Sequence, residues 1–582
     1  MPATGSSQGA RYAAWVLAAK LRELLTGSAF RVRELVTGSV GETAPVGAAP
    51  VRDTPLRLDR TERGQLQVIR RFGTIGSLLL ACGGLGAGAS PTINPLLDTP
   101  ILGVFARIPT VAMASAFSGM LMMVLAWLWL GRLVWPGRPR VLSRAQMDRT
   151  LVMWTIPLIL VPPMFSQDVY SYLAQSSVVS HGLDPYTVGA AQALGPDNLL
   201  ARNVPTLWRD TPSPYGPLFL TVGRAITAIA GDNIVVGILL ERVLALVGLG
   251  LIVWALPRLA RRFHVPPVSA IWLGAANPLV VFHLVVGVHN EALAIGLMLA
   301  GFHVAISKLP KIAPGDPIPP WSREELVRVL AGATLITMGG GVKILALVAL
   351  GFLGVMIARR WGGGLPQLLK AAAAMLVVGV VVLTLITVVS GLGWGWLKTL
   401  NGGTIIYTWL SPVTLVALGS VGLGILFQLG NHVDATVGAA RLVGWVGFAF
   451  SGVFLLWRTY RGHLSAMAGL GLFLVWFNVL GPVVQPWYPL WAIIPLATAK
   501  CSRRFRLCVT AFSALIALVT PPTGSTFDGR AFLIPTAAVA ALILVGLLLL
   551  LVRGKLPERE PRGEPLVTPA PAADRSASGR LG

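Results

Sequence analysis

A short polar segment interrupts an otherwise apolar chain at residues 165–172, which read FSQDVYSY. It follows directly on the apolar run 151–164. Asp168 lies three to four residues beyond that run, where the dielectric constant is falling and the surroundings can tune the basicity of a carboxylate. A carboxylate placed in this way can act as a general base that takes a proton from an attacking hydroxyl group. A helix cap or a solvated loop acid is the alternative.

Aromatic and polar side chains continue beyond this carboxylate. Tyr170 and Tyr172 are two residues apart, and a turn with the sequence HGLDPY follows at 181–186. The tyrosines predict either a stacking and hydrogen-bonding surface for sugar rings or an interfacial aromatic belt. In the turn, His181 and Tyr186 are candidate binding residues. Asp184 either initiates the turn or supplies a second carboxylate close to the first.

The segment 208–217 reads WRDTPSPYGP and closes this polar region. Trp208, Arg209 and Tyr215 combine aromatic rings with a positive charge, and three prolines stiffen the backbone between them. Such a loop suits the head group of an amphiphile, although plain loop rigidity would use the same residues.

Two further polar positions lie between apolar runs. His289, Asn290 and Glu291 form a tight turn and are candidate binding residues, because they would face the same side as Asp168 and could meet it in space; an ordinary polar turn is the alternative. No second histidine stands at zinc-ligand spacing from His289, so we expect no metal there. Lys343 lies within an apolar run, where a lysine is costly and should be paired. It either binds the phosphate of a lipid or extends to the head groups.

Aromatic residues also cluster at 394–409 and at 485–488, which reads QPWY. Gln485, Trp487 and Tyr488 are candidate sugar-binding residues, with a membrane-interface belt as the alternative for each ring. Glu241 and Arg242 are adjacent within another apolar run, so they point to different helix faces and should have separate partners.

The amino-acid composition indicates which kind of structure holds these polar residues in place. The chain has 582 residues, of which 54% are hydrophobic and only 12% are charged. A soluble protein has about a quarter of its residues charged, and the apolar runs here recur at lengths that cross ~30 Å of hydrocarbon. Continuous apolar runs exclude a membrane β-barrel, so the sequence predicts an all-α polytopic membrane protein.

The net charge of +23 fits basic loops on the cytoplasmic side of a membrane. Nucleic-acid binding would need a basic face with interleaved aromatics on a soluble domain, and we expect no nucleic-acid partner. Three cysteines have neither metal nor disulfide spacing. No Walker motif is present, and no dinucleotide fingerprint lies in a βαβ context. A transferase of this composition would need a lipid-borne donor and no cofactor.

The positive-inside rule fixes the predicted topology. The apolar runs are 73–90, 110–134, 150–165, 216–231, 233–257, 267–288, 292–308, 326–340, 343–358, 367–390, 412–430, 439–457, 464–482, 487–499, 507–521 and 531–552. Basic clusters beside these runs should be cytoplasmic, so an even number of crossings must separate any two of them. This rule makes 216–231 and 412–430 re-entrant or surface segments and leaves about fourteen spans, with both termini inside.

The same topology divides the chain into parts. Residues 1–71 are expected to form a partly disordered cytoplasmic arm with a possible amphipathic segment at 11–35, and residues 553–582 a disordered cytoplasmic tail. Residues 72–552 form the membrane domain. Within it, the segments 91–109, 166–232, 289–291, 340–342, 391–438, 482–487 and 522–530 face outside, so all the polar motifs share one side.

The motifs at 166–172, 184–186 and 208–217, together with Asn277-Pro278-Leu279, His283-Leu284 and His289-Asn290, resemble those of a known family. This is the polyprenol-phosphate-mannose-dependent α-(1→6)-mannopyranosyltransferase family of actinobacteria, whose members are GT-C-type enzymes that build the mannan core of lipomannan. The resemblance covers residues 73–552. It departs at one position, because the turn of the family reads His-Asn-Asp where this chain has Glu291.

The resemblance implies a donor, an acceptor and a base. The donor is polyprenyl (decaprenyl) phosphomannose, and the acceptor is mannosylated phosphatidylinositol or a growing α-(1→6)-mannan. Transfer inverts the anomeric centre at the outer face of the plasma membrane. A carboxylate on the first large outer loop, 166–232, is the general base, and this role falls on Asp168.

Two other classes of function fit a polytopic protein. A transporter or flippase of a lipid-linked glycan should show inverted repeats and polar residues at the middle of the membrane. This sequence has no obvious internal repeat, and its polar residues gather outside the spans. A non-catalytic partner in cell-envelope assembly with the same fold is the third possibility.

Overall fold

The structure is a computed structural model that describes residues 56–310, 317–400, 406–524 and 529–553. Its longer helices are α2 (Arg60–Ala87), α4 (Pro109–Gly131), α5 (Arg144–Thr155), α6 (Asp168–Ser180), α10 (Pro217–Ala230), α11 (Ile234–Arg262), α13 (Glu291–Ile306), α14 (Arg323–Val342), α15 (Val348–Arg360), α16 (Leu365–Ser390), α18 (Pro412–Leu426), α19 (Val433–Tyr460), α20 (Ala466–Leu480), α22 (Arg503–Val519) and α23 (Ile534–Arg553).

Short elements connect these helices. They are β1 (Leu56–Arg57), α3 (Gly103–Arg107), β2 (Arg140–Val141), η1 (Ile156–Leu158), α7 (Ala190–Leu194), α8 (Leu199–Asn203), α9 (Thr206–Arg209), α12 (Pro267–Gly274), the π-helix η2 (Val280–Val286), η3 (Ile344–Leu347), α17 (Trp396–Thr399), α21 (Pro489–Leu496) and η5 (Gly529–Leu533). The strands β1 and β2 pair in parallel and are only two residues long each. All other regular elements of the described chain are helices.

Seven described helices are long and apolar enough to cross a membrane: α2, α4, α11, α14, α16, α19 and α23. An eighth is possible if η2 and α13, which meet at an angle of 110°, count as one broken span. The predicted helical multi-pass membrane protein is therefore confirmed. The count of about fourteen spans stays a prediction. Both segments predicted not to cross, 216–231 and 412–430, correspond to short apolar helices, α10 and α18.

The first described helix begins before residue 72, the boundary that we predicted for the membrane domain. Asp59 caps α2 by accepting from the Glu62 N–H at 2.8 Å, and the Glu62 carboxylate accepts from the Asp59 N–H in return. This capping box starts the helix at Arg60, within the segment 1–71 that we assigned to the cytoplasmic arm. The possible amphipathic segment 11–35 and the tail beyond Arg553 lie outside the described residues.

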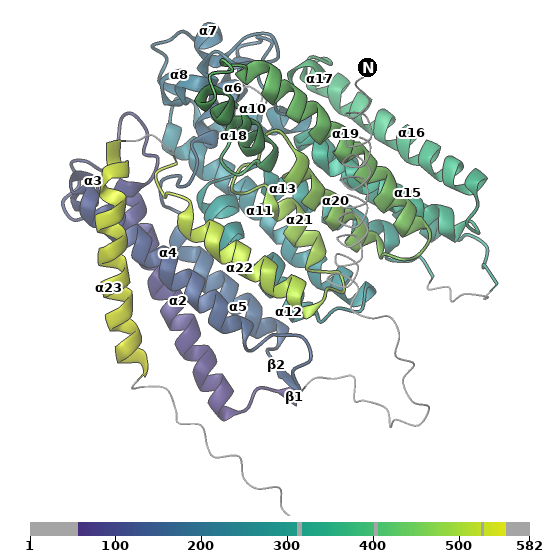
Figure 1. Cartoon of the computed structure of the whole chain (residues 1–582), viewed down its shortest axis with the longest axis horizontal. Coiled ribbons are helices and arrows are strands. Elements are labelled where there is room, and N and C mark those ends of the chain that lie inside the picture. The colour runs from purple at the N-terminus through teal and green to yellow at the C-terminus, as the bar shows by residue number, and fades with distance from the viewer. Residues whose placement is uncertain (1–55, 311–316, 401–405, 525–528, 554–582) are drawn as a thin grey trace, which may run out of the picture.

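The basic and the polar connections gather at opposite ends of the bundle. At one end, Arg138 pairs with Glu62, Arg262 donates to the Leu309 carbonyl and Arg360 pairs with Glu325. The N-terminal end of α2 and the C-terminal end of α23 both lie at this end in Figure 1, beside β1 and β2.

The other end carries α6, α7, α8 and the N-terminus of α10 (Figure 1). Here Thr92 donates to Asn203, and Ser411 donates to the Gly481 carbonyl at 2.9 Å. The side of the membrane predicted for each of these connections stays a prediction.

Close backbone packing of α11 on α13 positions the start of α13. A Cβ atom added at Gly248 of α11 would lie 2.3 Å from the Ala292 carbonyl carbon, directly beside Glu291. Only glycine permits this approach, since a contact below 3.0 Å forces one helix to move.

We expect Gly248→Ala to destabilise the protein by about 1–3 kcal/mol, as overpacking in a core does. Gly250→Ala on the same helix is a matched control, because nothing lies within 4 Å of its added Cβ atom. Thermal unfolding of both variants in detergent micelles measures the difference. Equal melting temperatures would contradict the close packing.

Candidate active site

Asp168 is the first residue of α6 and stands at one end of the bundle. Its backbone N–H donates to Ser166 Oγ at 3.1 Å, and its carboxylate benefits from the positive end of the helix dipole. The residue at the N-cap position is Gln167, so Asp168 does not cap the helix with its side chain. The side chain is 26% exposed, which leaves the carboxylate open to a ligand.

The sharp bend between η2 and α13 brings a second set of polar groups to Asp168. His289 Nδ1 lies 3.5 Å from Asp168 Oδ2 and 3.8 Å from Glu291 Oε2. Both His289 and Glu291 are fully buried. The turn that the sequence singled out at 289–291 therefore meets the polar segment 165–172 in space.

Glu291 is the centre of a buried network. Its carboxylate accepts from the Lys343 ammonium and from Trp487 Nε1, the latter at 3.0 Å. The Trp487 ring stacks on His289 with a centroid distance of 3.7 Å, and the Lys343 ammonium lies 5.6 Å from the centre of the Tyr488 ring. The sequence predicted a partner for Lys343, and this partner is a carboxylate within the protein.

Aromatic rings form a further wall. Tyr172, one turn beyond Asp168 on α6, packs edge-to-face against Tyr215 with a centroid distance of 4.9 Å. Phe219 of α10 contacts both rings. Because these rings are buried and locked against one another, they supply a rigid surface beside the carboxylate.

Two strained turns hold this arrangement. Phe165 and Val288 have φ angles of +66° and +56°, a left-handed conformation that is costly for a residue with a side chain. A hydrogen bond from Met164 N to the Val286 carbonyl joins the two turns. A second hydrogen bond, from Phe165 N to the Pro522 carbonyl at 3.0 Å, ties the first turn to a third segment. Strain of this kind persists where the surrounding structure fixes the backbone, and here it directly precedes His289 and the Asp168 segment.

Arg242 of α11 hydrogen-bonds to the backbone of the segment before Asp168 and of the segment before His289. Its guanidinium is fully buried and donates to the carbonyls of Ile159, Val285 and Val286, with Nη1 2.6 Å from the Ile159 oxygen. These carbonyls lie where the helices η1 and η2 end, so Arg242 satisfies backbone groups that a broken helix leaves unpaired. Arg242 thus has partners of its own, as predicted, whereas Glu241 Oε1 has no hydrogen-bond partner among the described residues, and the partner predicted for Glu241 stays a prediction.

Several buried polar atoms beside Asp168 lack hydrogen-bond partners among the described residues. They include both ring nitrogens of His283 and of His289, and both side-chain polar atoms of Asn290. Buried polar groups are normally satisfied, so this concentration makes the surroundings of Asp168 a candidate binding place for a polar ligand. The described residues include no group of three or more His, Cys, Asp or Glu side chains placed to hold a metal ion.

The surroundings make Asp168 a stronger base than an ordinary aspartate. Burial raises the pKa of Asp168 to about 6, with the Lys343 charge acting to lower it and the Glu291 charge acting to raise it. A carboxylate with this pKa is ionised at neutral pH and still holds a proton more tightly than a solvated acid.

Other predicted residues lie apart from this cluster. The helix α6 has thirteen residues and is about 20 Å long, and it separates Asp168 from His181 and Asp184. Asp184 Oδ1 accepts from the Tyr186 N–H at 2.9 Å. The alternative of a second carboxylate close to Asp168 is therefore wrong, and Asp184 initiates the turn. Tyr186 itself donates to the Tyr215 carbonyl at 3.2 Å, behind the aromatic wall.

The remaining candidates have contacts of their own. Tyr170 points away from Tyr172 and donates to the Ala89 carbonyl. Arg209 donates to the carbonyls of Val204 and Arg202 at 2.9 and 2.7 Å, so its charge stabilises the loop around α9. Trp208 packs partly buried against the core, and the Gln485 carbonyl accepts from the Tyr488 N–H.

Sequence reasoning assigned no role to three residues that the structure brings to the site. His283 was quoted only as part of a motif, yet its ring centre lies 5.8 Å from that of Trp487. Ser166 accepts from the Asp168 N–H, and Arg242 donates to carbonyls of the two segments that precede Asp168 and His289. A histidine in a continuous apolar run was the available signal for His283, because such a residue is rarely buried without a function.

The fold and the site together define a multi-pass helical membrane protein with a carboxylate-centred site where its spans break. Comparison with known sequences gives the family. The family profile described as "Alpha-(1->6)-mannopyranosyltransferase, N-terminal domain" matches residues 70–359, and the profile "MptB C-terminal domain" matches residues 413–550. The chain belongs to the α-(1→6)-mannopyranosyltransferase family, which confirms the resemblance.

Individual relatives match over nearly their whole length. A probable α-(1→6)-mannopyranosyltransferase of Mycolicibacterium smegmatis is 43% identical, covering 89% of this chain and 95% of the relative. An α-(1→6)-mannopyranosyltransferase of Mycobacterium tuberculosis is 42% identical, covering 90% and 94%. The α-(1→6)-mannopyranosyltransferase B of Corynebacterium glutamicum is 36% identical, covering 82% and 81%. No solved structure matches the chain.

Proposed function

We propose that this chain is a GT-C-type glycosyltransferase that moves mannose from polyprenyl (decaprenyl) phosphomannose to a lipid-linked α-(1→6)-mannan acceptor. Transfer takes place at the outer face of the plasma membrane and inverts the anomeric centre. The observation that carries the proposal is the partly open Asp168 carboxylate beside the buried His289 and Glu291 and the partly exposed Lys343. The names of the relatives support the sugar and the linkage.

The chemistry follows from these positions. Asp168 takes the proton of the attacking 6-hydroxyl group, whose oxygen forms the new bond to the anomeric carbon. The bond from that carbon to the phosphate breaks, and polyprenyl phosphate leaves. Because phosphate is a good leaving group, alignment and deprotonation of the acceptor are the main tasks. The rings of Tyr172, Tyr215 and Trp487 hold the sugars.

Lys343 is the cation best suited to the donor phosphate. It lies in the same cluster as Asp168, whereas Arg209 is occupied by two loop carbonyls. Glu291 holds the ammonium in place, so a phosphate meets a positioned charge and not a free side chain.

The outer location is supported by the distribution of charge. The basic connections gather at the end of the bundle opposite Asp168, and basic loops favour the cytoplasm. A donor with a polyprenyl chain reaches a site at the outer surface from within the membrane.

A labelling assay tests the proposal. Membranes or proteoliposomes that contain this chain should transfer labelled mannose from polyprenyl phosphomannose to an α-(1→6)-mannoside acceptor, and ionophores should leave the rate unchanged. A transporter or flippase would instead move the lipid-linked sugar without forming a new glycosidic bond. Absence of any labelled product from active, folded protein would overturn the proposal.

The pH dependence of transfer tests the charges around Asp168. A general base works when deprotonated, so activity should be full above the pKa of Asp168 and fall as the pH drops through about 6. Lys343→Met removes a charge that lowers this pKa and should move the midpoint to higher pH. Glu291→Gln removes a charge that raises it and should move the midpoint to lower pH. Shifts in the same direction would contradict this electrostatic arrangement.

A further inference from the structure

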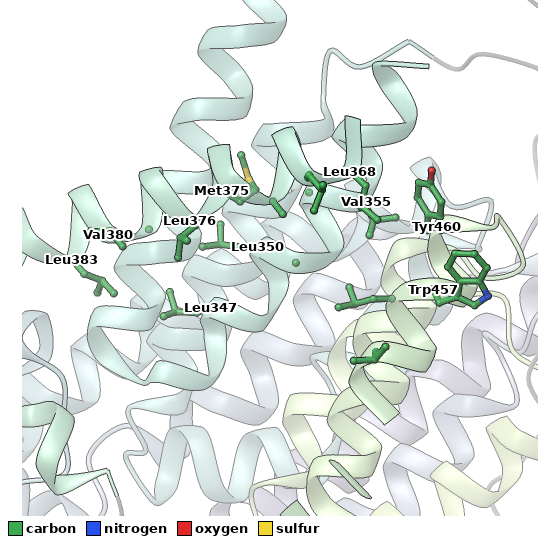
Figure 2. Close-up of a pocket in the computed structure, with 17 residues that line it drawn as sticks. Leu347, Leu350, Val355, Leu368, Met375, Leu376, Val380, Leu383, Trp457 and Tyr460 are labelled. Atoms are coloured by element: carbon green, nitrogen blue, oxygen red, sulfur yellow. The ribbon is translucent and has the colours of Figure 1, made fainter. Parts of the chain in front are cut away.

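An apolar groove runs along the helices α15, α16 and α19, and none of the polar site residues described above lines it (Figure 2). Its cavity volume is about 640 Å³. α15 packs against both of the other helices and forms the floor. No charged side chain lines the groove, and the polar atoms of its lining side chains belong only to Trp457 and Tyr460.

The groove follows the long axis of α16. Leu368 and Leu383 line it fifteen residues apart on this helix, which corresponds to about 22 Å of the ~30 Å hydrocarbon thickness. Figure 2 shows Leu383, Val380 and Leu376 in sequence along one side, with Trp457 and Tyr460 at the opposite end. α15 and α19 both end in arginines next to this aromatic end. The groove therefore extends from the basic end of the bundle toward the site.

The end of the groove at Leu347 adjoins the site. Leu347 lies four residues beyond Lys343 and packs on Gly340 of α14, where an added Cβ atom would meet its Cδ2 at 2.3 Å. On α16, one turn beyond Leu383, Ile386 Cδ1 lies 3.3 Å from a Cβ atom added at Gly341. At this end of the groove, the lining residue Leu347 therefore contacts the C-terminal end of α14, directly before Lys343.

Glycines make the groove wide. Gly351 and Gly379 line it, and a Cβ atom added to either meets its nearest neighbour at 3.6 and 3.4 Å, an ordinary contact distance. A Cβ atom at these positions is therefore accommodated at ordinary contact distance, and a longer side chain would extend from it into the groove.

We infer that this groove binds the isoprenoid chain of the donor, with the phosphate at Lys343 and the sugar beside Asp168. The inference rests on the proposed function and adds the place where the lipid part of the substrate binds. A long, uncharged hydrocarbon fits the uncharged lining of the groove. The groove extends from the site toward the basic end of the bundle, so a chain bound in it would lie along the hydrocarbon layer of the membrane. Binding the chain here raises the affinity for the whole donor and keeps its phosphate near Lys343.

The first experiment compares two donors. Gly351→Leu and Gly379→Leu narrow the groove, and Gly546→Leu on α23 is the control, because nothing lies within 4 Å of a Cβ atom added there. With long-chain polyprenyl phosphomannose, each groove variant should raise KM about tenfold at unchanged kcat, the loss expected when a few methylene contacts disappear. With a short-chain, geranyl-type phosphomannose, KM should stay at the wild-type value.

Two results would overturn the groove assignment: unchanged KM for the long-chain donor, or the same increase for both donors. Either result leaves the proposed function intact as long as wild-type protein transfers mannose. Failure of wild-type protein with both donors would count against the proposed function itself.

A second experiment needs no turnover. A polyprenyl phosphomannose with a photoreactive diazirine near the end of its chain is irradiated with wild-type protein in nanodiscs. Labelled peptides from α15, α16 or α19 support the inference, and Gly379→Leu should reduce this labelling. If the label falls on other helices, or if only a diazirine-bearing phospholipid labels the groove, ordinary membrane lipid occupies it and the inference is wrong.

Discussion

Asp168→Asn is expected to lower the rate of mannose transfer about a hundredfold to ten-thousandfold, the range that a positioned general base contributes. Asparagine keeps the size of the side chain and its place at the start of α6, but it cannot take the proton of the acceptor hydroxyl. The effect should therefore appear in kcat, with the protein still folded in the membrane.

Transfer of labelled mannose by purified protein in proteoliposomes measures this loss. Asp232→Asn is the matched control, since Asp232 is exposed in the turn between α10 and α11 near the same end of the bundle. It should transfer at the wild-type rate. Wild-type activity in the Asp168 variant would remove this residue from the mechanism.

Breaking the pair of Glu291 and Lys343 should destabilise the protein strongly. Removal of one partner of a buried ion pair costs about 3–5 kcal/mol, because the other charge is left without compensation. The two partners are unequal: Glu291 is fully buried, whereas the Lys343 side chain is 24% exposed. Lys343→Met, which strands the buried carboxylate, should therefore cost more than Glu291→Leu, which strands an ammonium that can reach solvent.

The double variant separates the pair from its surroundings. With both charges replaced by apolar side chains of similar size, most of the lost stability should return, as for other buried pairs. Thermal unfolding of the three variants in the same detergent gives the coupling free energy. Additive losses in the double variant would mean that the two charges do not stabilise each other.

Much of the candidate site can be located from the amino-acid sequence alone. Asp168, the turn 289–291, Lys343 and the segment 485–488 stand out because each is polar beside an apolar run, and the positive-inside rule puts all of them on one side. In the structure, Asp168, His289, Glu291, Lys343 and Trp487 meet in one cluster.

Other expectations failed for a local reason. The residues after Asp168 were treated as a loop, which allowed Asp184 to be close to it. They form the continuous helix α6, in which nothing between Val169 and Ser180 is a glycine or a proline, and a rigid rod keeps the two carboxylates apart. The same loop interpretation hid the aromatic wall, because Tyr172 and Tyr215 meet only when α6 packs against α10.

The amino-acid sequence by itself determined that this protein is a helical membrane protein. Hydrophobic length and charge are properties of single segments, and each segment inserts into the membrane according to its own length and flanking charge. The pairing of Glu291 with Lys343, 52 residues later, was decided by tertiary structure, as was the apolar groove that starts beside them. Burial and packing depend on neighbours from distant parts of the chain. The free energy of a buried charge therefore cannot be deduced from its own segment, because it depends on which groups surround the charge.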